Sequence, residues 1–393
     1  MAGICTSAEW PQAVRNIYEP VGYLGKGGFA CVLLGKSKKP VKGQEESYVA
    51  IKIVDGTEDD WAYSHREADI LRQLNHPNIM RVVNSWEPTE YEPGAMALSY
   101  AKGPTIQALL SHGGALSTLF VRIVTAQIVD ALSYMHSHAV VHRDIKPENI
   151  IVTGADLKDD SIWDSVDNLD DQDWPTLRNK WKPTLIDFGF ARALTPKDVS
   201  TKKFERQDDC MGNTFRRQMS AVGTEDFVAP EIMQDIHQEE HKDPRVVTDT
   251  ISHNVADYSV LVDAYSMGCN IRYMMTGCPP HTCVKDAIAR QNSMLSKFIG
   301  SVFGRKRKSG KEDETKRKVA YRLEENLSTI VRELMTSMMD QDETKRTSVR
   351  MARRHPWLAE VLPETTDGDG NIEYLHLVMG SATQAGETKV EQQ

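Results

Sequence analysis

The sequence predicts an α+β fold in two lobes, with a small sheet-rich lobe first and a larger, mostly helical lobe after it. Residues 18–101 alternate short apolar strand patterns with turn signals, and one helical pattern interrupts them near residues 60–74. A helical lobe of ~250 residues follows, which is within the size of one domain. Its first helix is indicated by apolar residues at helical spacing from residue 118 onward: Leu119, Ile123, Ala126, Ile128, Leu132 and Met135.

Composition and charge exclude several functional classes. The 393 residues are 40% hydrophobic and carry a formal net charge of −9, so no general nucleic-acid binding is expected. No apolar run of about 18 residues predicts a membrane span, and the N-terminus lacks a signal-peptide core or a myristoylation glycine. The six cysteines include no Cys-x-x-Cys pair, which indicates reduced thiols and a cytoplasmic protein, with a nuclear location as the alternative.

Residues 142–149, with the sequence His-Arg-Asp-Ile-Lys-Pro-Glu-Asn, carry the strongest functional signal. Asp144 could accept a proton from an alcohol, and Lys146 could neutralise a phosphate. Asn149 could hold a metal ion through its amide oxygen. This set of groups suits phosphoryl transfer, in which catalysis consists mostly of positioning and charge stabilisation.

Further motifs flank this stretch in a fixed order. A glycine-rich turn at residues 24–32, a short strand ending in Lys52 and a helical pattern containing Glu67 precede it. Residues 187–189 (Asp-Phe-Gly) and 229–231 (Ala-Pro-Glu) follow it. Together the motifs resemble the signature set of eukaryotic protein kinases. A single glycine loop would be weak evidence, whereas the complete ordered set is strong.

The resemblance covers residues 18–358 and implies a bilobal protein-kinase-like fold. It places the N-lobe at residues 18–101 and the C-lobe at residues 102–358, with residues 1–17 as a lead-in and 359–393 as a disordered tail. The sequence Lys-Pro-Glu-Asn at residues 146–149 resembles the serine/threonine branch of the family rather than the tyrosine branch. The implied activity is transfer of the ATP γ-phosphate to Ser or Thr hydroxyls of protein substrates, with ATP and Mg²⁺ as cofactors.

The resemblance also assigns roles to the charged residues. Lys52 would contact the α- and β-phosphates of ATP and pair with Glu67. Asn149 and Asp187 would bind Mg²⁺, because a hard cation takes oxygen ligands. Asp144 would orient the substrate hydroxyl and accept its proton. The lysine two residues later would stabilise charge on the transferred phosphoryl group.

A nucleotide pocket is implied as well. Gly25 and Gly27 would let the backbone approach phosphate oxygens, because glycine has no Cβ. Ala30 stands where the family has a third glycine, a departure expected to weaken nucleotide binding without abolishing it. The adenine ring would meet Leu98 as gatekeeper, the backbone of Ser99 and Ala101, and the side chains of Val32, Ala50 and Ile151.

Other residues that match the family are expected to support the site rather than to do chemistry. His142 and Phe188 would pack in the core beneath it. Residues 263–268, which begin with Asp263, resemble the start of the buried helix that anchors the catalytic loop in the family. Glu231 would pair with Arg346 and hold the C-lobe together.

Two other classes of function compete with an active kinase. A pseudokinase scaffold on the same fold would bind nucleotide or partners without catalysis, and fold alone does not decide activity. Pseudokinases tend to lose one of Lys52, Asp144, Asn149 and Asp187, whereas all four stand here. A small-molecule kinase is the third class, and residues 229–231 argue against it because they resemble peptide-substrate machinery.

Several polar segments lie between or after the motifs. Residues 154–182 look inserted, with eight Asp and one Lys between residues 156 and 173. They would form either a solvated loop or a docking surface for a basic partner. Residues 234–256 also look inserted. The basic tract at 305–318 is either a nuclear localisation signal or another solvated loop.

Substrate preference and regulation are suggested by four positions. Glu148 resembles the position that contacts basic residues N-terminal to the target in basophilic kinases, and Thr105 sits where some of those kinases carry a second acid. A mild basic preference is therefore expected. By the resemblance, Arg143 would pair with a phosphate on Ser220. Ser220 lies in the activation segment, which runs from Asp187 to Glu231, and the pair would order this segment. The alternative is that Ser220 is one of several exposed loop hydroxyls.

Overall fold

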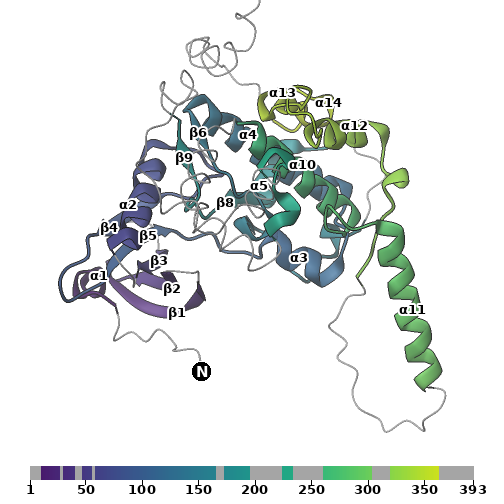
Figure 1. Cartoon of the computed structure of the whole chain (residues 1–393). Helices are drawn as coiled ribbons and strands as arrows, with labels where there is room; N and C mark the ends of the chain where they lie inside the picture. Colours follow the sequence, from purple (N-terminus) through teal and green to yellow (C-terminus); the bar gives the residue numbers. More distant parts are fainter. Residues whose placement is uncertain are drawn as a thin grey trace, which may run out of the picture.

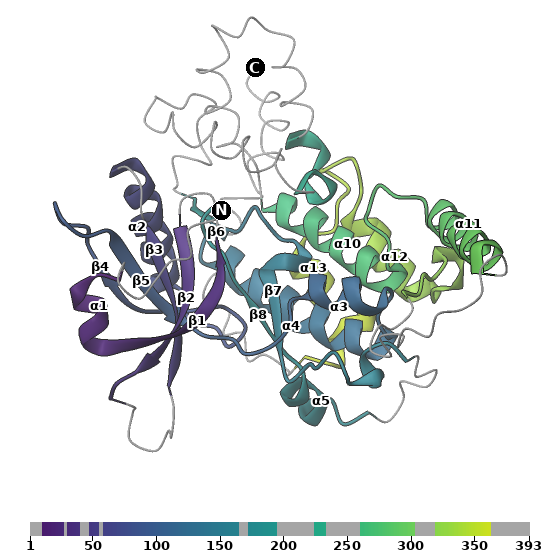
Figure 2. The same ribbon diagram turned by 90° about the horizontal axis from the view of Figure 1, so that it is seen from below.

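The structure of the chain, a computed structural model, consists of a sheet-containing lobe and a helical lobe side by side (Figure 1). A second view, turned by 90°, shows the same separation (Figure 2). The residues that the structure describes are 10–26, 30–39, 47–54, 58–164, 172–194, 224–232, 260–302 and 319–362. The predicted α+β architecture with two lobes is confirmed.

The small lobe is built on a five-stranded antiparallel sheet. Side chains alternate between its two faces, as the pleat requires. In the central strand Ile51 and Ile53 are buried on one face, whereas Ala50 and Lys52 are half-buried on the other. The strands, in their order across the sheet, are β1 (Tyr18–Lys26), β2 (Ala30–Ser37), β3 (Tyr48–Val54), β5 (Gly94–Ser99) and β4 (Val82–Trp86).

Helices cover both faces of this sheet. The short helix α1 (Gln12–Ile17) and the preceding Trp10 pack on the face that buries Ile51, and Trp10 is only 2% exposed. The other face is covered by α2 (Glu58–Gln73), whose Leu71 belongs to the same apolar cluster as Leu98 of β5. Residues 10–17, which we expected as a lead-in, are therefore part of the lobe.

The helical lobe is organised around α4 (Thr118–Ser137). Ser117 caps this helix by accepting a hydrogen bond from the Phe120 N–H. By length and composition α4 could cross a membrane, but 78% of its most apolar stretch is buried inside the lobe, as in the core helix of a folded domain. The helices around it are α3 (Ile106–Gly113), α10 (Leu261–Thr276), α11 (Val284–Val302), α12 (Thr329–Met338), α13 (Val349–Arg353) and α14 (Pro356–Ala359).

Two short strand pairs frame the functional loops. β6 (Val140–Val141) pairs with β9 (Arg192–Ala193), and β7 (Ile150–Thr153) pairs with β8 (Lys182–Leu185). The loop between β6 and β7 contains residues 142–149 and ends in the 3₁₀ helix η2 (Pro147–Asn149), while the loop between β8 and β9 contains residues 187–189. The pairing therefore brings two sequence motifs to the same edge of the lobe.

The described parts of the acidic insert, residues 154–164 and 172–182, are folded against the helical lobe. Ile162 of η3 (Asp160–Ile162) is fully buried, and Trp181 is 1% exposed. The Trp181 ring contacts Phe120 of α4 edge-on, with ring centroids 5.1 Å apart. These apolar anchors offset the ordering cost that a purely acidic loop could not offset.

Several insert carboxylates have local structural roles. Asp173 caps α5 (Trp174–Lys180) by accepting from the Thr176 N–H, and Asp159 accepts from Ser161 and pairs with Lys180 at 3.2 Å. These carboxylates are thus partly occupied within the insert. A basic partner for the insert remains a prediction, and residues 165–171 lie outside the described residues.

Some predicted segments fall outside the part of the chain that the structure describes. These are residues 234–256, the basic tract at 305–318 and residues 363–393 of the expected tail. The tail was expected to begin at residue 359, but Val361 is 1% exposed and belongs to the main apolar cluster. Near the basic tract, α11 projects from the lobe (Figure 1), and the Lys285–Glu325 ion pair of 3.2 Å links its first turn to η5 (Glu324–Asn326).

Candidate active site

The loop between β6 and β7 closes on itself around Asp144. The Lys146 ammonium lies 2.8 Å from Oδ2 of Asp144. The Asn149 amide nitrogen donates to both the backbone carbonyl and Oδ2 of Asp144, each at 2.9 Å. Asp144 itself is 5% exposed. The three residues that the sequence singled out are therefore one hydrogen-bonded cluster.

A fully buried carboxylate beneath the loop holds its beginning. Asp263 of α10 accepts hydrogen bonds from the backbone N–H groups of His142 (2.9 Å) and Arg143 (2.8 Å). It also accepts from Nε2 of His136 on α4, at 2.8 Å. Burial on its own raises the pKa of Asp263, but the hydrogen bond and charge of His136 outweigh it and hold this pKa below its ordinary value.

These hydrogen bonds explain an uncommon backbone conformation. Arg143 has φ of 68°, in the left-handed region that side chains other than glycine adopt at a cost. Because Asp263 fixes the N–H of this residue and of the one before it, the strained conformation persists. The expected anchoring role of Asp263 is thus present, while its partner His136 was missed by sequence reasoning.

The small lobe contributes the predicted ion pair. The Lys52 ammonium lies 2.6 Å from Oε2 of Glu67, which joins β3 to α2. Glu67 is 2% exposed. Burial lowers the pKa of Lys52, but the charges of Glu67 and Asp187 outweigh it, so the net direction is upward and the ammonium stays charged.

Asp187 lies two residues after the end of β8, where its charge acts on Lys52 of the small lobe and on Asp144 of the helical lobe. Its carboxylate raises the pKa of Lys52 and contributes to the raised pKa of Asp144, for which burial is the larger cause. Asp187 has φ of 60°, and its Oδ1 accepts a 3.4 Å hydrogen bond from the Gly189 N–H. This second left-handed residue turns the chain sharply behind the carboxylate.

The donor set fits a hard divalent cation bound together with a phosphate. The nitrogen of the Asn149 amide is committed to Asp144, so the amide oxygen is the atom left for a metal. Asp187 supplies carboxylate oxygens, which such cations prefer. Among the described residues no group of three or more His, Cys, Asp or Glu side chains could hold a metal alone, so ligand oxygens from a nucleotide would have to complete the site.

The side chains predicted to surround the adenine ring come from four strands of the structure, β2, β3, β5 and β7. Val32 lies opposite Lys52 in the β2–β3 register, and Ala50 lies opposite Leu98 in the β3–β5 register. Leu98 is 3% exposed, whereas Val32, Ala50 and Ile151 of β7 are half-buried. Leu98 thus lies beneath the accessible surface, and its role as gatekeeper stays a prediction.

Ser99, Ala101 and Gly25 are the other predicted nucleotide-site residues that the structure describes. The Ser99 N–H donates to the carbonyl of Arg81, so the carbonyl is the backbone group that Ser99 can present. Ala101 follows in the connection to α3 and is half-buried. Gly25 lies opposite Val32 in the sheet, and a Cβ there would touch nothing within 4 Å. Gly27 lies outside the described residues.

The remaining supporting residues occupy their expected positions. His142 and Phe188 are both fully buried, with ring centroids 4.7 Å apart. Arg346 makes two hydrogen bonds to the Glu231 carboxylate, at 2.6 and 2.9 Å, and its guanidinium lies 5.1 Å from the ring of Tyr265. This bidentate pair ties the segment after residue 224 to the end of the domain.

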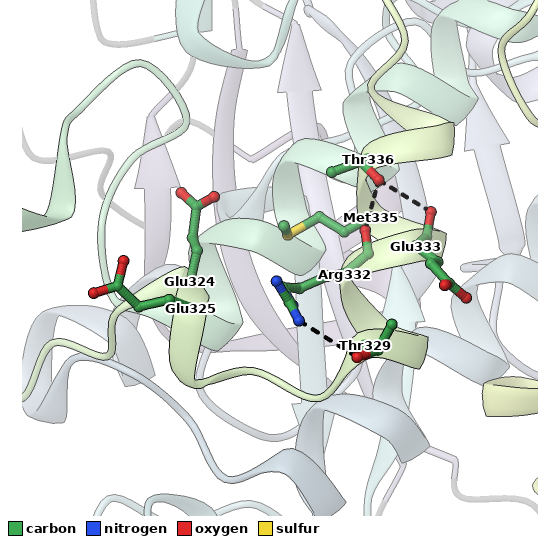
Figure 3. A pocket seen from close by; sticks show the side chains of 7 residues that line it. All are labelled: Glu324, Glu325, Thr329, Arg332, Glu333, Met335 and Thr336. Carbon is green, nitrogen blue, oxygen red and sulfur yellow. Dashed lines mark hydrogen bonds between the residues drawn. The ribbon is translucent and has the colours of Figure 1, made fainter.

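A separate hollow lies between η5 and α12 on the helical lobe (Figure 3). Its lining contains none of the predicted catalytic, metal-binding or nucleotide-binding residues. Two of its carboxylates are already paired, because Glu324 lies 2.7 Å from Arg272 and Glu325 lies 3.2 Å from Lys285. The Arg332 side chain in the hollow donates a long, 3.4 Å hydrogen bond to Thr329. This hollow is therefore distinct from the cluster of Asp144, Lys146 and Asn149.

Comparisons with known proteins agree with this geometry. The family model described as protein kinase domain matches residues 18–358. Serine/threonine-protein kinase RAD53 of Saccharomyces cerevisiae is 27% identical over 340 residues, which cover 85% of this chain and 32% of that protein. Serine/threonine-protein kinase PKH2 of the same yeast is 24% identical over 300 residues, which cover 76% of this chain and 21% of that protein.

A mammalian relative shows the same pattern of coverage. Serine/threonine-protein kinase 36 of Mus musculus is 27% identical over 267 residues, which cover 67% of this chain and 15% of that protein. The chain therefore spans a third or less of the length of these three relatives. The similarity covers only that part of the larger proteins and says nothing of their remainder.

The opposite pKa shifts of two buried aspartates predict opposite effects on stability. Burial raises the pKa of Asp144 in the folded state, so its stabilising contribution is complete at low pH and is lost as the pH rises through that pKa. Asp144→Asn should therefore increase the free energy of unfolding at neutral pH, with a gain that shrinks in acid. The pKa of Asp263 is lowered in the folded state, so its charged form stabilises the fold at neutral pH. Asp263→Asn should therefore reduce the free energy of unfolding at neutral pH.

Denaturant unfolding of both variants at neutral and acidic pH measures these differences. Each substitution removes one charge and nearly preserves volume, so the two variants are matched controls for each other. A lower stability of Asp144→Asn at neutral pH would contradict the inference that the charged form of Asp144 destabilises the folded state.

Proposed function

Because the chain belongs to the eukaryotic protein kinase family, on its serine/threonine branch, we propose that it is an active enzyme. It transfers the γ-phosphate of ATP to Ser or Thr hydroxyls of protein substrates. One observation carries this proposal: the 2.6 Å Lys52–Glu67 pair and the Asp144–Lys146–Asn149 cluster are assembled in the same structure. Positioning and charge stabilisation are what phosphoryl transfer requires of a protein.

The residues divide the work by their charge and place. Asp144 orients the substrate hydroxyl and accepts its proton, and its upward-shifted pKa makes it a better base than an ordinary surface carboxylate. Lys146, 2.8 Å away, neutralises charge on the transferred group. Lys52 holds the nucleotide phosphates, and Glu67 keeps its ammonium in place.

Asn149 and Asp187 would hold the divalent cation, which we propose to be Mg²⁺. When bound, the cation neutralises the phosphate oxygens and lowers the charge barrier to transfer. The protein's own contribution is to orient its two oxygen ligands. Asn149 is oriented through its bonds to Asp144, and Asp187 through the turn at its positive φ.

A pseudokinase scaffold is the second candidate. The observation that favours it is Ala30 in place of a third glycine, which puts a methyl group near the start of β2. Against it stands the complete set of Lys52, Asp144, Asn149 and Asp187. An intact set would have no purpose in a scaffold that only binds partners, so we place catalysis first.

The first test of activity is the replacement Asp187→Asn. It removes a metal-binding charge, so turnover with ATP and Mg²⁺ on generic protein substrates should fall by about a hundredfold or more. Asp173→Asn is a matched control, because Asn also caps helices and Asp173 lies on the insert. Purified wild type that transfers no phosphate to any generic substrate, whether or not it is phosphorylated itself, would establish the scaffold instead.

A mild preference for basic residues N-terminal to the target is the next proposal. The Glu148 side chain in η2 is exposed and makes no hydrogen bond or ion pair with any residue that the structure describes. It stands two residues after Lys146, beside the reacting groups. Thr105 carries no charge, and its Oγ1 is already used to cap α3 by accepting from the Ala108 N–H. One free carboxylate in solvent supports only a weak preference.

Glu148→Gln should therefore reduce discrimination between target peptides with arginine and with alanine N-terminal to the phosphorylated residue. An exposed ion pair allows roughly a two- to fivefold change in kcat/KM. Glu333→Gln, an exposed glutamate on α12, is the matched control. A peptide array that favours proline directly after the target, with no basic bias, would refute the preference.

Phosphorylation of Ser220 is the proposed regulatory step. Arg143, which is 8% exposed and directly precedes Asp144, would pair with the phosphate. Ser220 lies outside the described residues, so the proposal rests on its place three residues before Gly223 and on Arg217 at its −3 position. The new pair would order the activation segment next to the catalytic cluster.

Wild type and Ser220→Ala should differ after incubation with ATP, because the variant cannot gain this pair. We expect lower turnover in the variant, together with a phosphate on Ser220 of wild type by mass spectrometry. Thr214→Ala tests a second hydroxyl on the same segment, six residues before Ser220. Equal turnover of wild type and Ser220→Ala, or full activity with Ser220 unmodified, would end the hypothesis.

A further inference from the structure

A polar side chain lies in the apolar interior directly beneath the catalytic loop. Asn270 of α10 is fully buried, and its neighbours Met267, Ile271 and Met274 on the same helix are fully buried as well. An amide in such surroundings loses its hydration, which is unfavourable unless its hydrogen-bonding groups find partners. What Asn270 contacts therefore indicates why it is there.

The amide nitrogen of Asn270 faces two backbone carbonyls. It donates to the carbonyl of Ile145 at 3.0 Å and to the carbonyl of Ser266, one turn earlier in α10, at 2.7 Å. Both partners can only accept, so the nitrogen rather than the oxygen must point toward them. The Oδ1 atom of Asn270 is buried and has no hydrogen-bond partner among the described residues. The side chain thus sacrifices one acceptor to keep two donors engaged.

Ile145 is the residue between the two reacting side chains. Its carbonyl belongs to the peptide that links it to Lys146, and Asp144 is the residue before it. Fixing this carbonyl fixes the rotation of the peptide plane, because the peptide bond is rigid. The 2.8 Å distance between Asp144 and Lys146 therefore depends on the orientation that the Asn270 amide imposes.

Asn270 is one of three polar residues on a single stripe of α10. Asp263, Ser266 and Asn270 follow the i, i+3, i+7 spacing that places side chains on one helical face. Asp263 binds the N–H groups of residues 142 and 143, and the Ser266 hydroxyl donates to the carbonyl of Phe227 at 2.7 Å. The stripe therefore holds the backbone of the catalytic loop at its beginning and at its centre, about two helical turns apart.

We propose that Asn270 is a positioning residue of the phosphoryl-transfer reaction. It acts through the Ile145 carbonyl to set the relative orientation of Asp144 and Lys146, and it does not touch the substrate. The proposal rests on the kinase activity proposed above. Its consequence is a separation of stability from turnover, because the same side chain leaves a buried acceptor unpartnered.

The main test is Asn270→Leu, which keeps the number and branching of the side chain's heavy atoms and removes both the donor and the unpartnered oxygen. We expect the melting temperature to change little, because removal of the unpartnered oxygen offsets the loss of the donor to the Ile145 carbonyl, while kcat falls about ten- to hundredfold, as misplaced reacting groups allow. KM for ATP should change less, because Lys52, Val32, Ala50 and Leu98 of the nucleotide site lie on the small lobe. A purely structural role would instead lower the melting temperature and leave kcat of the folded enzyme unchanged.

Two further variants isolate the contact with the loop. Asn270→Ser can still donate within the helix to the Ser266 carbonyl but is too short to reach Ile145, so it should lose kcat as the leucine variant does. Thr125→Val is the matched control for removing a buried polar atom. Thr125 of α4 is fully buried, and its Oγ1 has no partner among the described residues. This variant should keep the kcat of wild type.

Hydrogen exchange tests the positioning without relying on activity. The amides of residues 144–150 should exchange at least several-fold faster in Asn270→Leu than in wild type, and at the wild-type rate in Thr125→Val. If wild type shows no turnover, the kinase proposal fails and the exchange rates alone decide the positioning role. Unchanged exchange in folded Asn270→Leu overturns it, as does unchanged kcat in an active enzyme.

Discussion

The buried carboxylate of Asp263 is the constraint on which the rest of the site depends. It has no exposure to solvent and accepts three hydrogen bonds, two of them from backbone N–H groups of the catalytic loop. A buried charge without such partners would be strongly unfavourable, so the loop cannot leave this carboxylate without a large penalty. That penalty keeps Arg143 in a strained backbone conformation and delivers Asp144 to a defined place.

In the small lobe, the alternation of side chains along β3 and the packing of α2 determine the position of Lys52. Strand alternation puts Ile51 under α1 and Lys52 on the opposite face, so the sheet determines the direction of the lysine. Glu67 can meet it at 2.6 Å only while α2 packs on that face. The charge of Asp187 also acts on both Lys52 and Asp144, so the groups supplied by the two lobes form one electrostatic unit.

Residues confined to short motifs could be predicted from sequence, and residues that act across long separations could not. Asp144, Lys146 and Asn149 have their chemistry within six positions, and ordered motifs supplied Lys52, Glu67 and Asp187. His136 gave no signal because its partner Asp263 is 127 positions away. The insert was ambiguous because its acidic residues dominate the composition, whereas the buried Ile162 and Trp181 decide the packing of its described parts. The segment of residues 10–17, which contains Trp10 and α1, was likewise too short to show helical periodicity.

The polar stripe of α10 also explains how the fold accommodates so much buried polarity. Asp144 would be easier to bury uncharged, as the direction of its pKa shows, and the oxygen of Asn270 has no partner among the described residues. The buried charge of Asp144 and the unpartnered oxygen of Asn270 both reduce the stability of the fold. Burial of the apolar cluster around α4 and α10 offsets this loss. A helix that served only to pack would present apolar side chains at all of these positions. Polar groups instead stand where they hold loop backbone in a fixed orientation, as the positioning role proposed for Asn270 requires.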